Sequence, residues 1–318
     1  KLGPALATGC TVVLKPAEQT PLSALRLGDL IMEAGFPEGV VNIVPGYGET
    51  AGAALAAHSD VDKVAFTGST EVGKLIVHAA TGNLKKVSLE LGGKSPNVVF
   101  KDADLETAIP GAASAIFFNH GQCCCAGSRL YVEKAVYDQV VEGVAQHAKK
   151  IKVGSGLEPD TQMGPLVSEE QLNRVCGYLE SGFSEGAKAV AGGHKAGDRG
   201  YFVEPTVLVN TNEDMKVVQE EIFGPVVTAM PFTDPEEIIP RANDSDYGLA
   251  AAVWTRDIGK AHLVAEQLRA GTVWINCYNI FDAGLPFGGY KQSGWGREMG
   301  HDVLNLYTQT KAVCARIA

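Results

Sequence analysis

The sequence predicts an α/β fold in which helices cover parallel sheets. Short runs of β-branched residues alternate with helical patterns from the beginning of the chain, and two glycine-rich turns join a strand directly to a helix. This βαβαβ order implies a parallel, doubly wound sheet with right-handed crossovers. At 318 residues the chain exceeds a typical single domain. We therefore expect two α/β lobes.

The first lobe is predicted to span residues 1–92. Its helix at 21–34 has Thr20 as candidate N-cap, Pro21 in the first turn and Gly35 as its stop. The remaining elements are strands at 11–15, 40–44, 63–66 and 87–91, and helices at 50–57 and 71–80. We expect the four strands to lie in one sheet.

The second lobe is predicted to begin at the Gly92-Gly93-Lys94 turn and to span residues 93–307. Alternation persists there, with strands at 95–100, 130–132, 226–232, 250–254 and 272–276, and helices at 105–119, 135–149, 168–185, 236–243 and 258–268. Residues 308–318 read as an edge strand without a partner nearby in sequence. An orphan edge strand invites pairing with another lobe or another subunit.

Composition excludes several classes of function. Hydrophobic residues make up 45% and charged residues 20%, as in a globular protein with a sizeable core. The net charge of −10 argues against binding to nucleic acid or to an acidic membrane surface. No apolar run approaches the roughly 18 residues of a transmembrane helix.

The seven cysteines form no CxxC pair and no metal-ligand spacing with histidines, so we expect no metal site. Three of them are consecutive, Cys123, Cys124 and Cys125, between Gly121 and Gly127. This run is either a nucleophilic thiol presented at a helix–loop–strand junction or a cluster of small buried hydrophobes. An odd count with a thiol triplet suits a reducing compartment, so we expect a cytoplasmic protein.

Two glycine-rich turns compete as phosphate-binding loops. One is GYGETAG (46–52) and the other is FTGSTEVG (66–73), where Ser69 and the free N–H groups of the helix can meet a phosphate. Each alone is a weak signal, but two on neighbouring strands favour a nucleotide crevice. Lys15 and Glu18 are expected at the same edge, where a carboxylate accepts from ribose hydroxyls and repels a 2′-phosphate.

Four further positions or segments are candidates for chemistry or binding. Glu90 ends an apolar strand before two glycines, and burial would raise its pKa toward that of a general base. His120 lies four residues before Cys124, but a histidine without a carboxylate to orient it is a weak partner. Of the adjacent acids at 220–221, one is expected to reach a sugar hydroxyl. The long loop at 276–289 carries Phe281 and Phe287, which are predicted to line an apolar pocket.

Together these segments resemble the NAD(P)-dependent aldehyde dehydrogenase superfamily, specifically its NAD-preferring, non-acylating members. The resemblance spans essentially the whole chain and rests on the ordered motifs LKPAEQTP (14–21), FTGSTEVG (66–73), LELGGKSPN (89–97), GQCCCAG (121–127), EEIFGP (220–225) and PFGGYK (286–291).

The resemblance assigns roles by position. It implies that Cys124 is the nucleophile and Glu90 the general base. It implies contacts to NAD from Lys15, Glu18, Gly48, Gly68, Ser69, Gly73, Leu91, Glu221 and Phe223. It implies a Rossmann-like NAD-binding domain (1–92, incomplete), a catalytic domain (93–307) and an oligomerisation strand (308–318). It also implies a small aldehyde as substrate and a homo-oligomer, a dimer or tetramer.

The implied reaction is oxidation of an aldehyde to a carboxylic acid through a thiohemiacetal and a thioester on Cys124, the thioester being hydrolysed by water that Glu90 activates. A coenzyme-A-acylating semialdehyde dehydrogenase and a non-catalytic structural relative are the alternatives. Family members begin well before Lys1, and the earlier segment carries sheet strands and an asparagine of the oxyanion hole. We therefore expect the chain by itself to be poorly active. A mitochondrial targeting segment would lie in the same part.

Overall fold

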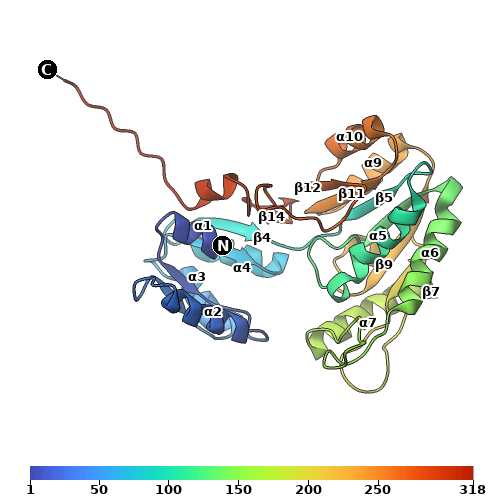
Figure 1. Cartoon of the computed structure of the whole chain (residues 1–318), viewed down its shortest axis with the longest axis horizontal. Coiled ribbons are helices and arrows are strands. Elements are labelled where there is room, and N and C mark those ends of the chain that lie inside the picture. Colours follow the sequence, from blue (N-terminus) through green and yellow to red (C-terminus); the bar gives the residue numbers. More distant parts are fainter. Residues whose placement is uncertain (318) are drawn as a thin grey trace. The chain divides into compact units, whose positions relative to one another are not determined.

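The computed structural model describes residues 1–317 and divides the chain into two compact units (Figure 1). The first unit contains Lys1–Glu90, Asp282–Phe287 and the chain from Trp295 onward, and the second contains Leu91–Phe281 and Gly288–Gly294. This division differs from the predicted boundary after residue 92. The difference arises because two later segments, Asp282–Phe287 and the chain from Trp295 onward, belong to the first unit. The order of elements along the sequence does not indicate this.

The first unit contains two separate small sheets. Its strands are β1 (Val12–Leu14), β2 (Val41–Ile43), β3 (Lys63–Thr67), β4 (Lys86–Glu90) and β14 (Gly294–Trp295). β1 pairs with β2, and β14, β4 and β3 form a sheet in that order. The single sheet predicted for this lobe is therefore wrong, because no strand within residues 1–317 joins β1 to β3. Its helices are α1 (Leu2–Ala7), α2 (Leu22–Glu33), the π-helix η1 (Gly48–Gly52), α3 (Ala53–Ala57), α4 (Thr70–Ala80) and the 3-10 helix η4 (Asp302–Leu306).

Helix boundaries in the first unit follow local chemistry. Gly35 adopts a positive φ of 86° just after α2, as a helix-terminating glycine does. Ser69 caps α4, since its hydroxyl accepts from the Val72 N–H at 3.2 Å. Thr20 does not cap α2, however. The residue at the N-cap is Pro21, which supplies no side-chain hydrogen bond.

The second unit is built on a seven-stranded sheet in the order β12-β11-β5-β6-β9-β8-β7. All neighbours run parallel except β7, which is antiparallel to β8. The strands are β5 (Pro96–Val99), β6 (Arg129–Glu133), β7 (Lys188–Ala191), β8 (Thr206–Val209), β9 (Val226–Phe232), β11 (Ala250–Trp254) and β12 (Thr272–Ile275). A separate pair is β10 (Tyr247–Gly248) with β13 (Tyr290–Lys291).

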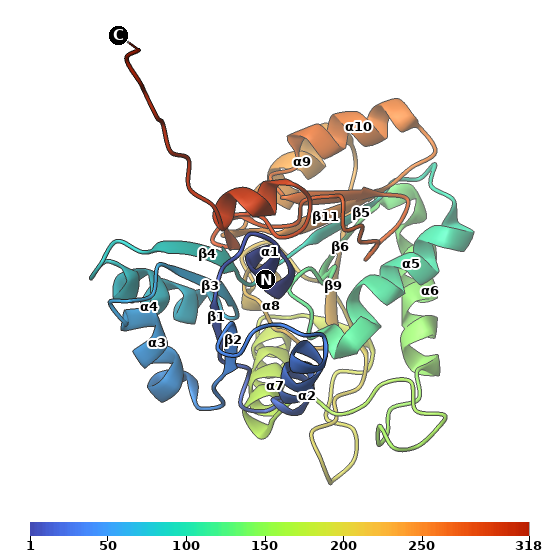
Figure 2. The ribbon, with the colours of Figure 1, turned by 60° about the vertical axis from the view of Figure 1, so that its left-hand side comes forward.

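Helices cover both faces of this sheet. They are α5 (Leu105–Phe117), α6 (Tyr137–Lys150), α7 (Glu169–Ser184), α8 (Lys216–Gln219), α9 (Pro235–Asn243) and α10 (Ile258–Gln267), with 3-10 helices η2 (Phe118–Gly121) and η3 (Lys134–Val136). Figure 2 shows α5 and α6 side by side on one side of the sheet, with α9 and α10 on the other. The central strands are consequently buried on both faces, with Val98, Tyr131 and Val253 fully inaccessible.

The predicted edge strand at the C-terminus is not formed in residues 308–317. This segment runs as an unpaired extended tail (Figure 1), and Val313 is 84% exposed. A strand needs a neighbour to pair with, and the described part of this chain offers none at the tail. Among residues 1–317, no helix is both long and apolar enough to cross a membrane.

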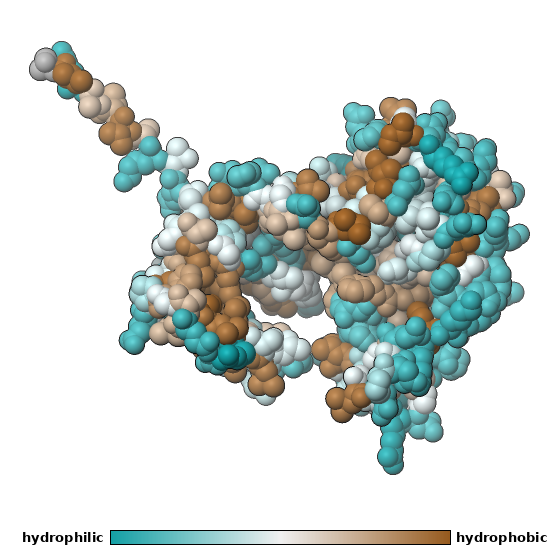
Figure 3. Space-filling model, viewed as in Figure 1, coloured by the Kyte–Doolittle hydropathy of each residue, from teal (hydrophilic) through white to brown (hydrophobic). Residues whose placement is uncertain are grey.

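Apolar side chains also lie on the surface of the first unit. The space-filling view shows hydrophobic residues gathered over its helices (Figure 3). Exposed members on and just after α2 are Leu22, Leu25, Leu27, Leu30, Met32 and Phe36. The apolar face of this helix is thus left largely uncovered within the chain.

Candidate active site

The cysteine run lies in a sharply turned loop between α5 and β6. Asn119, His120 and Gly121 all have positive φ, at 48°, 61° and 65°. Gly121 is required there, because a Cβ at this position would overlap the Gly224 carbonyl. The loop is tied back to α5 by the Gly127 N–H, which donates to the Ala115 carbonyl at 2.9 Å.

The three thiols have different environments. Cys125 is 1% exposed, and its Sγ lies 3.4 Å from that of Cys123 and 3.5 Å from Asn279 Oδ1. Hydrogen bonds from the neighbouring thiols, together with burial, raise the pKa of Cys125, whereas those same contacts lower the pKa of Cys123. Cys125 therefore stays a neutral thiol, held in place by the Tyr278 hydroxyl donating to its carbonyl at 2.7 Å. The partly exposed Cys123 and Cys124 are the thiols open to reagents.

Glu221 lies close to this loop within the second unit. Its Oε1 accepts from the Gly93 N–H at 2.9 Å, and a Cβ on Gly93 would overlap the Cys124 carbonyl oxygen. Burial raises the pKa of Glu221, although the Gly93 N–H, Lys94 and Arg174 oppose the shift. Arg174 also donates to the Glu221 carbonyl at 2.9 Å. The carboxylate is thus fixed through one oxygen.

Lys94 is a buried cation that the sequence patterns did not single out. It is 1% exposed, and its Nζ donates to the Val217 carbonyl at 2.8 Å. Burial, reinforced by Arg129, lowers the pKa of Lys94 to about 7, while Glu221 and Glu220 oppose the shift. The sequence did carry a signal for this burial. Lys94 is a charged residue that stands directly between the Gly92-Gly93 pair and an apolar strand.

Glu90 stands at the end of β4 in the first unit. It is 6% exposed, and its Oε2 is buried without a hydrogen-bond partner. Burial, and then the nearby Glu298 carboxylate, raise the pKa of Glu90 to about 8, while Lys1 and Arg297 act in the opposite direction. Lys1 bridges the Glu298 carboxylate at 2.8 Å and the Thr67 hydroxyl at 2.7 Å. A carboxyl in this state can take up a proton near neutral pH.

The FTGSTEVG turn follows β3, the strand paired with β4. Thr67 stands opposite Glu90 in the register, and the Gly68 N–H donates to the Glu90 carbonyl at 3.1 Å. A Cβ on Gly68 would lie 2.9 Å or less from two atoms of the Phe66 ring, so any larger residue here would displace that ring. Ser69 is engaged as the cap of α4, and the buried Gly73 donates to its carbonyl at 2.9 Å. The N-terminus of α4 therefore presents N–H groups suited to a phosphate.

Glu18, another predicted cofactor residue, lines a cleft of about 430 Å³ in the first unit, and Lys15 lies beside it. Lys15 Nζ donates to the carbonyls of Pro16 at 2.7 Å and Gly46 at 3.0 Å, and lies 3.3 Å from Glu18 Oε2. The cleft is lined by Pro16, Ala17, Glu18, Gln19, Pro21, Pro45, Gly46 and Tyr47. Apolar walls with one carboxylate fit an adenosine, because a flat base needs apolar contact and a ribose needs an acceptor. The GYGETAG turn contributes Gly46 and Tyr47 to this cleft. The two glycine-rich turns do not follow neighbouring strands of one sheet, because β2 and β3 belong to separate sheets.

The remaining predicted site residues are placed as follows. Gly48 begins η1, and the buried Leu91 donates to the Ser293 carbonyl at 3.0 Å. Phe223 has a positive φ of 56°, and its carbonyl accepts from Gln171 at 2.7 Å. Phe281 packs edge-on against Trp274 at 5.6 Å in the second unit, whereas Phe287 belongs to the first. A Cβ added to Gly164 would lie 3.3 Å from His120 Nε2, and the Nδ1 atom of His120 is buried without a hydrogen-bond partner.

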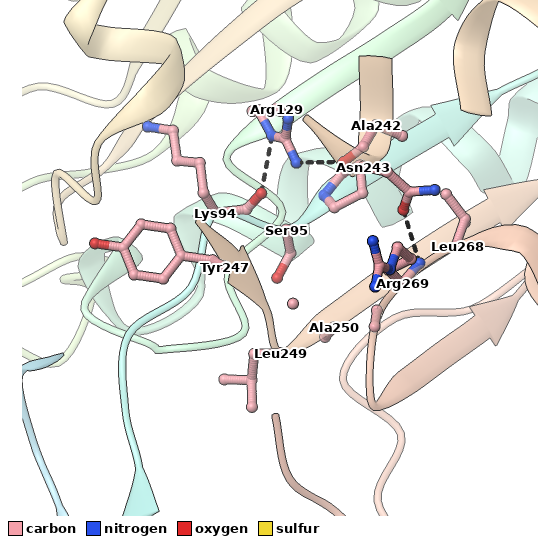
Figure 4. Close-up of a pocket in the computed structure, with 13 residues that line it drawn as sticks. Lys94, Ser95, Arg129, Ala242, Asn243, Tyr247, Leu249, Ala250, Leu268 and Arg269 are labelled. Atoms are coloured by element: carbon pink, nitrogen blue, oxygen red, sulfur yellow. Dashed lines mark hydrogen bonds between the residues drawn. The ribbon is translucent and has the colours of Figure 1, made fainter. Parts of the chain in front are cut away.

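A small cavity lies beside the start of β5 (Figure 4). Its volume of about 10 Å³ has room for about one water molecule. Arg129 reaches across it to the carbonyls of Lys94 at 2.8 Å and Ala242 at 2.7 Å, while the Lys94 side chain extends away (Figure 4). This cavity is part of the scaffold behind the Gly92–Lys94 turn. Residues 1–317 hold no cluster of ligands suited to a metal ion.

Comparison with known proteins matches the chain to the model of the aldehyde dehydrogenase family over residues 1–313. The mitochondrial aldehyde dehydrogenase of Mesocricetus auratus is 57% identical over 318 residues, covering 100% of this chain and 64% of the relative. Retinal dehydrogenase 2 of Mus musculus is 56% identical, covering 100% of this chain and 61% of that protein. A solved NAD+ complex of an aldehyde dehydrogenase from Bacillus cereus superposes with a TM-score of 0.98 at 57% identity, covering 100% and 65%.

The chain belongs to the aldehyde dehydrogenase family. The likeness to the solved structures confirms the predicted α/β class and the fold of that family. The chain spans less than two thirds of the length of the relatives it matches.

Proposed function

We propose that the chain carries the machinery of an NAD-dependent, non-acylating aldehyde dehydrogenase, which oxidises an aldehyde to a carboxylic acid. The observation that carries this proposal is the protonation state of Glu90. A buried carboxyl with an unpartnered oxygen and a pKa raised to about 8 is what a water-activating base requires. The family membership and the partly exposed thiols at Cys123 and Cys124 support it.

Cys124 is the proposed nucleophile. Its thiolate adds to the aldehyde carbon, and the resulting oxyanion accepts from the Cys124 backbone N–H. Of the two partly exposed thiols, Cys124 is chosen because it occupies the middle of the GQCCCAG motif. The hydride leaves the thiohemiacetal carbon, and bound NAD would supply the acceptor for it. The thioester left on Cys124 is hydrolysed by a water molecule whose proton Glu90 removes.

The cofactor contacts are divided between named residues. Glu18 binds the adenosine ribose in the cleft beside Lys15, and Glu221 binds the ribose next to the reactive ring. Gly68, Ser69 and Gly73 form the turn that meets the phosphates, with Phe223, Leu91 and Gly48 as further contacts. The Glu18 carboxylate disfavours a 2′-phosphate, which supports NAD over NADP. The pKa of Glu18 is lowered, mainly by a backbone hydrogen bond, which supports a charged carboxylate there.

Hydrolysis is favoured over transfer to coenzyme A. A thiol acceptor would need no base for water, whereas the raised pKa of Glu90 suits one. Phe281 and Phe287 are the proposed apolar contacts of the substrate.

Assembly and location are proposed on separate grounds. The extended tail exposes apolar residues, with Ile317 at 93%, and we propose that it pairs with a strand of another copy in a dimer or tetramer. All seven cysteines are free thiols, which suits a reducing compartment such as the cytoplasm. Relatives named as mitochondrial make the matrix the competing location.

The direct test measures two properties of the purified chain, NAD binding by calorimetry and aldehyde-dependent formation of NADH. A panel of aliphatic and aromatic aldehydes identifies the substrate class. The proposal predicts NAD binding at micromolar to millimolar concentrations. A chain that neither binds NAD nor forms NADH with any aldehyde contradicts it.

A further inference from the structure

The two glycines that follow β4 make unusually close contacts within the second unit. Ser293 Oγ donates to the Gly92 carbonyl at 2.6 Å, and the Gly93 N–H donates to Glu221 Oε1 at 2.9 Å. The Gly92 carbonyl and the Gly93 N–H are therefore each held by a side chain. The pair has no freedom to move without breaking one of these hydrogen bonds.

Gly92 faces the Glu221 side chain. A Cβ on Gly92 would overlap Glu221 Oε2 and would lie 2.7 Å from the carboxyl carbon. Real Cβ atoms do not approach other atoms this closely, so one group has to move. The group that yields is the carboxylate, because it is the end of a flexible side chain. A methyl at this position consequently displaces Glu221.

Gly93 faces the backbone of the cysteine loop. A Cβ on Gly93 would overlap the Cys124 carbonyl oxygen, and would lie 3.4 Å from the Cys124 carbonyl carbon and 3.3 Å from Leu249 Cβ. A backbone carbonyl cannot rotate away as a side chain can. A methyl here consequently displaces the peptide that follows the Cys124 side chain.

We propose that Gly92 and Gly93 are positioning residues with separate tasks: Gly92 makes room for the Glu221 carboxylate, and Gly93 sets the backbone that presents the Cys124 thiol. The Gly93 N–H also links the two tasks, because it is the donor that holds Glu221. This assignment deepens the proposed function, on which the role of Glu221 toward NAD rests. The task of Gly93 toward the thiol is independent of any cofactor.

The experiment compares Gly92→Ala, Gly93→Ala and a control, Gly177→Ala, each in the full chain. Gly177 lies on α7 with no atom within 4 Å of its added Cβ. Alkylation of Cys124 by iodoacetamide, followed by peptide mass mapping, measures the thiol without cofactor or aldehyde. Calorimetric titration with NAD measures the Glu221 site. Thermal unfolding verifies that each variant is folded.

Gly92→Ala is expected to weaken NAD binding roughly tenfold, as loss of a hydrogen bond to a charged group does, while the alkylation rate of Cys124 changes at most several-fold through the weakened Gly93 N–H contact. Gly93→Ala is expected to slow the alkylation of Cys124 roughly tenfold, because a displaced backbone misplaces the thiol. Gly177→Ala is expected to change neither. This split between thiol rate and NAD affinity is not produced by a general loss of stability.

Glu221→Ala supplies a second variant in case Gly93→Ala does not fold. It removes the acceptor of the Gly93 N–H, so the alkylation rate of Cys124 is expected to change several-fold. An unchanged Cys124 rate in the folded Gly93→Ala chain, or in Glu221→Ala when only that variant folds, overturns the role of Gly93. Unchanged NAD binding in Gly92→Ala overturns the role of Gly92. A wild-type chain that binds no NAD overturns the role of Gly92 together with the proposed function, whereas the alkylation result still decides on Gly93.

Discussion

Glu90 is buried and Glu221 is half-buried, both lie near glycines, and their surroundings prepare them for different tasks. Glu90 has one carboxyl oxygen without a partner, and another carboxylate, Glu298, helps to raise its pKa to about 8. Glu221 is held by a backbone N–H and lies in the field of two cations, Lys94 and Arg174, which oppose the effect of burial. The first environment adds a second carboxylate to the effect of burial, whereas in the second a backbone N–H and two basic side chains offset part of that effect. Burial alone therefore does not define a catalytic carboxyl, because its partners decide which protonation state is stable.

Both glutamates are proposed to serve a reaction that begins at Cys124, so removing this thiol is the most severe test. Cys124→Ala is expected to lower aldehyde oxidation by at least about 10⁴-fold, since the nucleophile has no substitute. NADH formation measures the effect, with Cys176→Ala on α7 as the matched control. Retention of activity in Cys124→Ala would transfer the role to Cys123.

Glu90→Gln tests the base assignment. The variant is expected to turn over roughly 10²–10⁴-fold more slowly, because an amide cannot accept the proton of water. One equivalent of NADH should still form in a burst, and mass spectrometry should detect the acyl adduct on Cys124. The wild-type hydrolysis rate should rise with pH up to about 8 as Glu90 ionises, and the variant should lose this dependence. A variant that hydrolyses the thioester normally refutes the role of Glu90.

Glu221→Gln tests the other side of the comparison. An uncharged amide should raise the KM for NAD roughly tenfold and leave the thioester hydrolysis step intact. Glu220→Gln is the control, because the adjacent Glu220 accepts from the Tyr178 hydroxyl at 2.7 Å instead. If Glu221→Gln and Glu220→Gln have the same KM for NAD, the proposed role of Glu221 in NAD binding is wrong.

The smallest expected effect is on stability. The pKa of Glu90 is raised from 4.5 to about 8 in the folded chain, so the folded state binds more protons than the unfolded state between these values. The contribution of Glu90 to stability is therefore fully present below about pH 4.5 and is lost as the pH rises toward 8. Thermal unfolding at several pH values should show wild type losing stability relative to Glu90→Gln across this window. Parallel pH dependence of the two melting temperatures would contradict the raised pKa.

The sequence by itself determined the α/β class, most element positions and the candidate motifs. The strand at 250–254 was predicted with its observed bounds, and the helix at 258–268 to within one residue, because each combines a clear apolar pattern with a capping residue or a break. The short strands β7 and β8 were missed, since they flank a glycine-rich segment without a clear alternation. Element type and helix ends depend on residues that are neighbours in the sequence, so the sequence alone can indicate them.

Tertiary structure alone decided what depends on distant neighbours. The division of the first lobe into two sheets and the unpaired tail follow from which strands find partners, and pairing is not encoded in a single strand. The orphaned oxygen of Glu90 and the burial of Lys94 follow from packing. The need for glycine at 93 arises from a carbonyl 31 residues further along the chain, at Cys124. Local patterns specify elements, whereas close approaches and proton affinities are set by atoms that only the folded chain brings together.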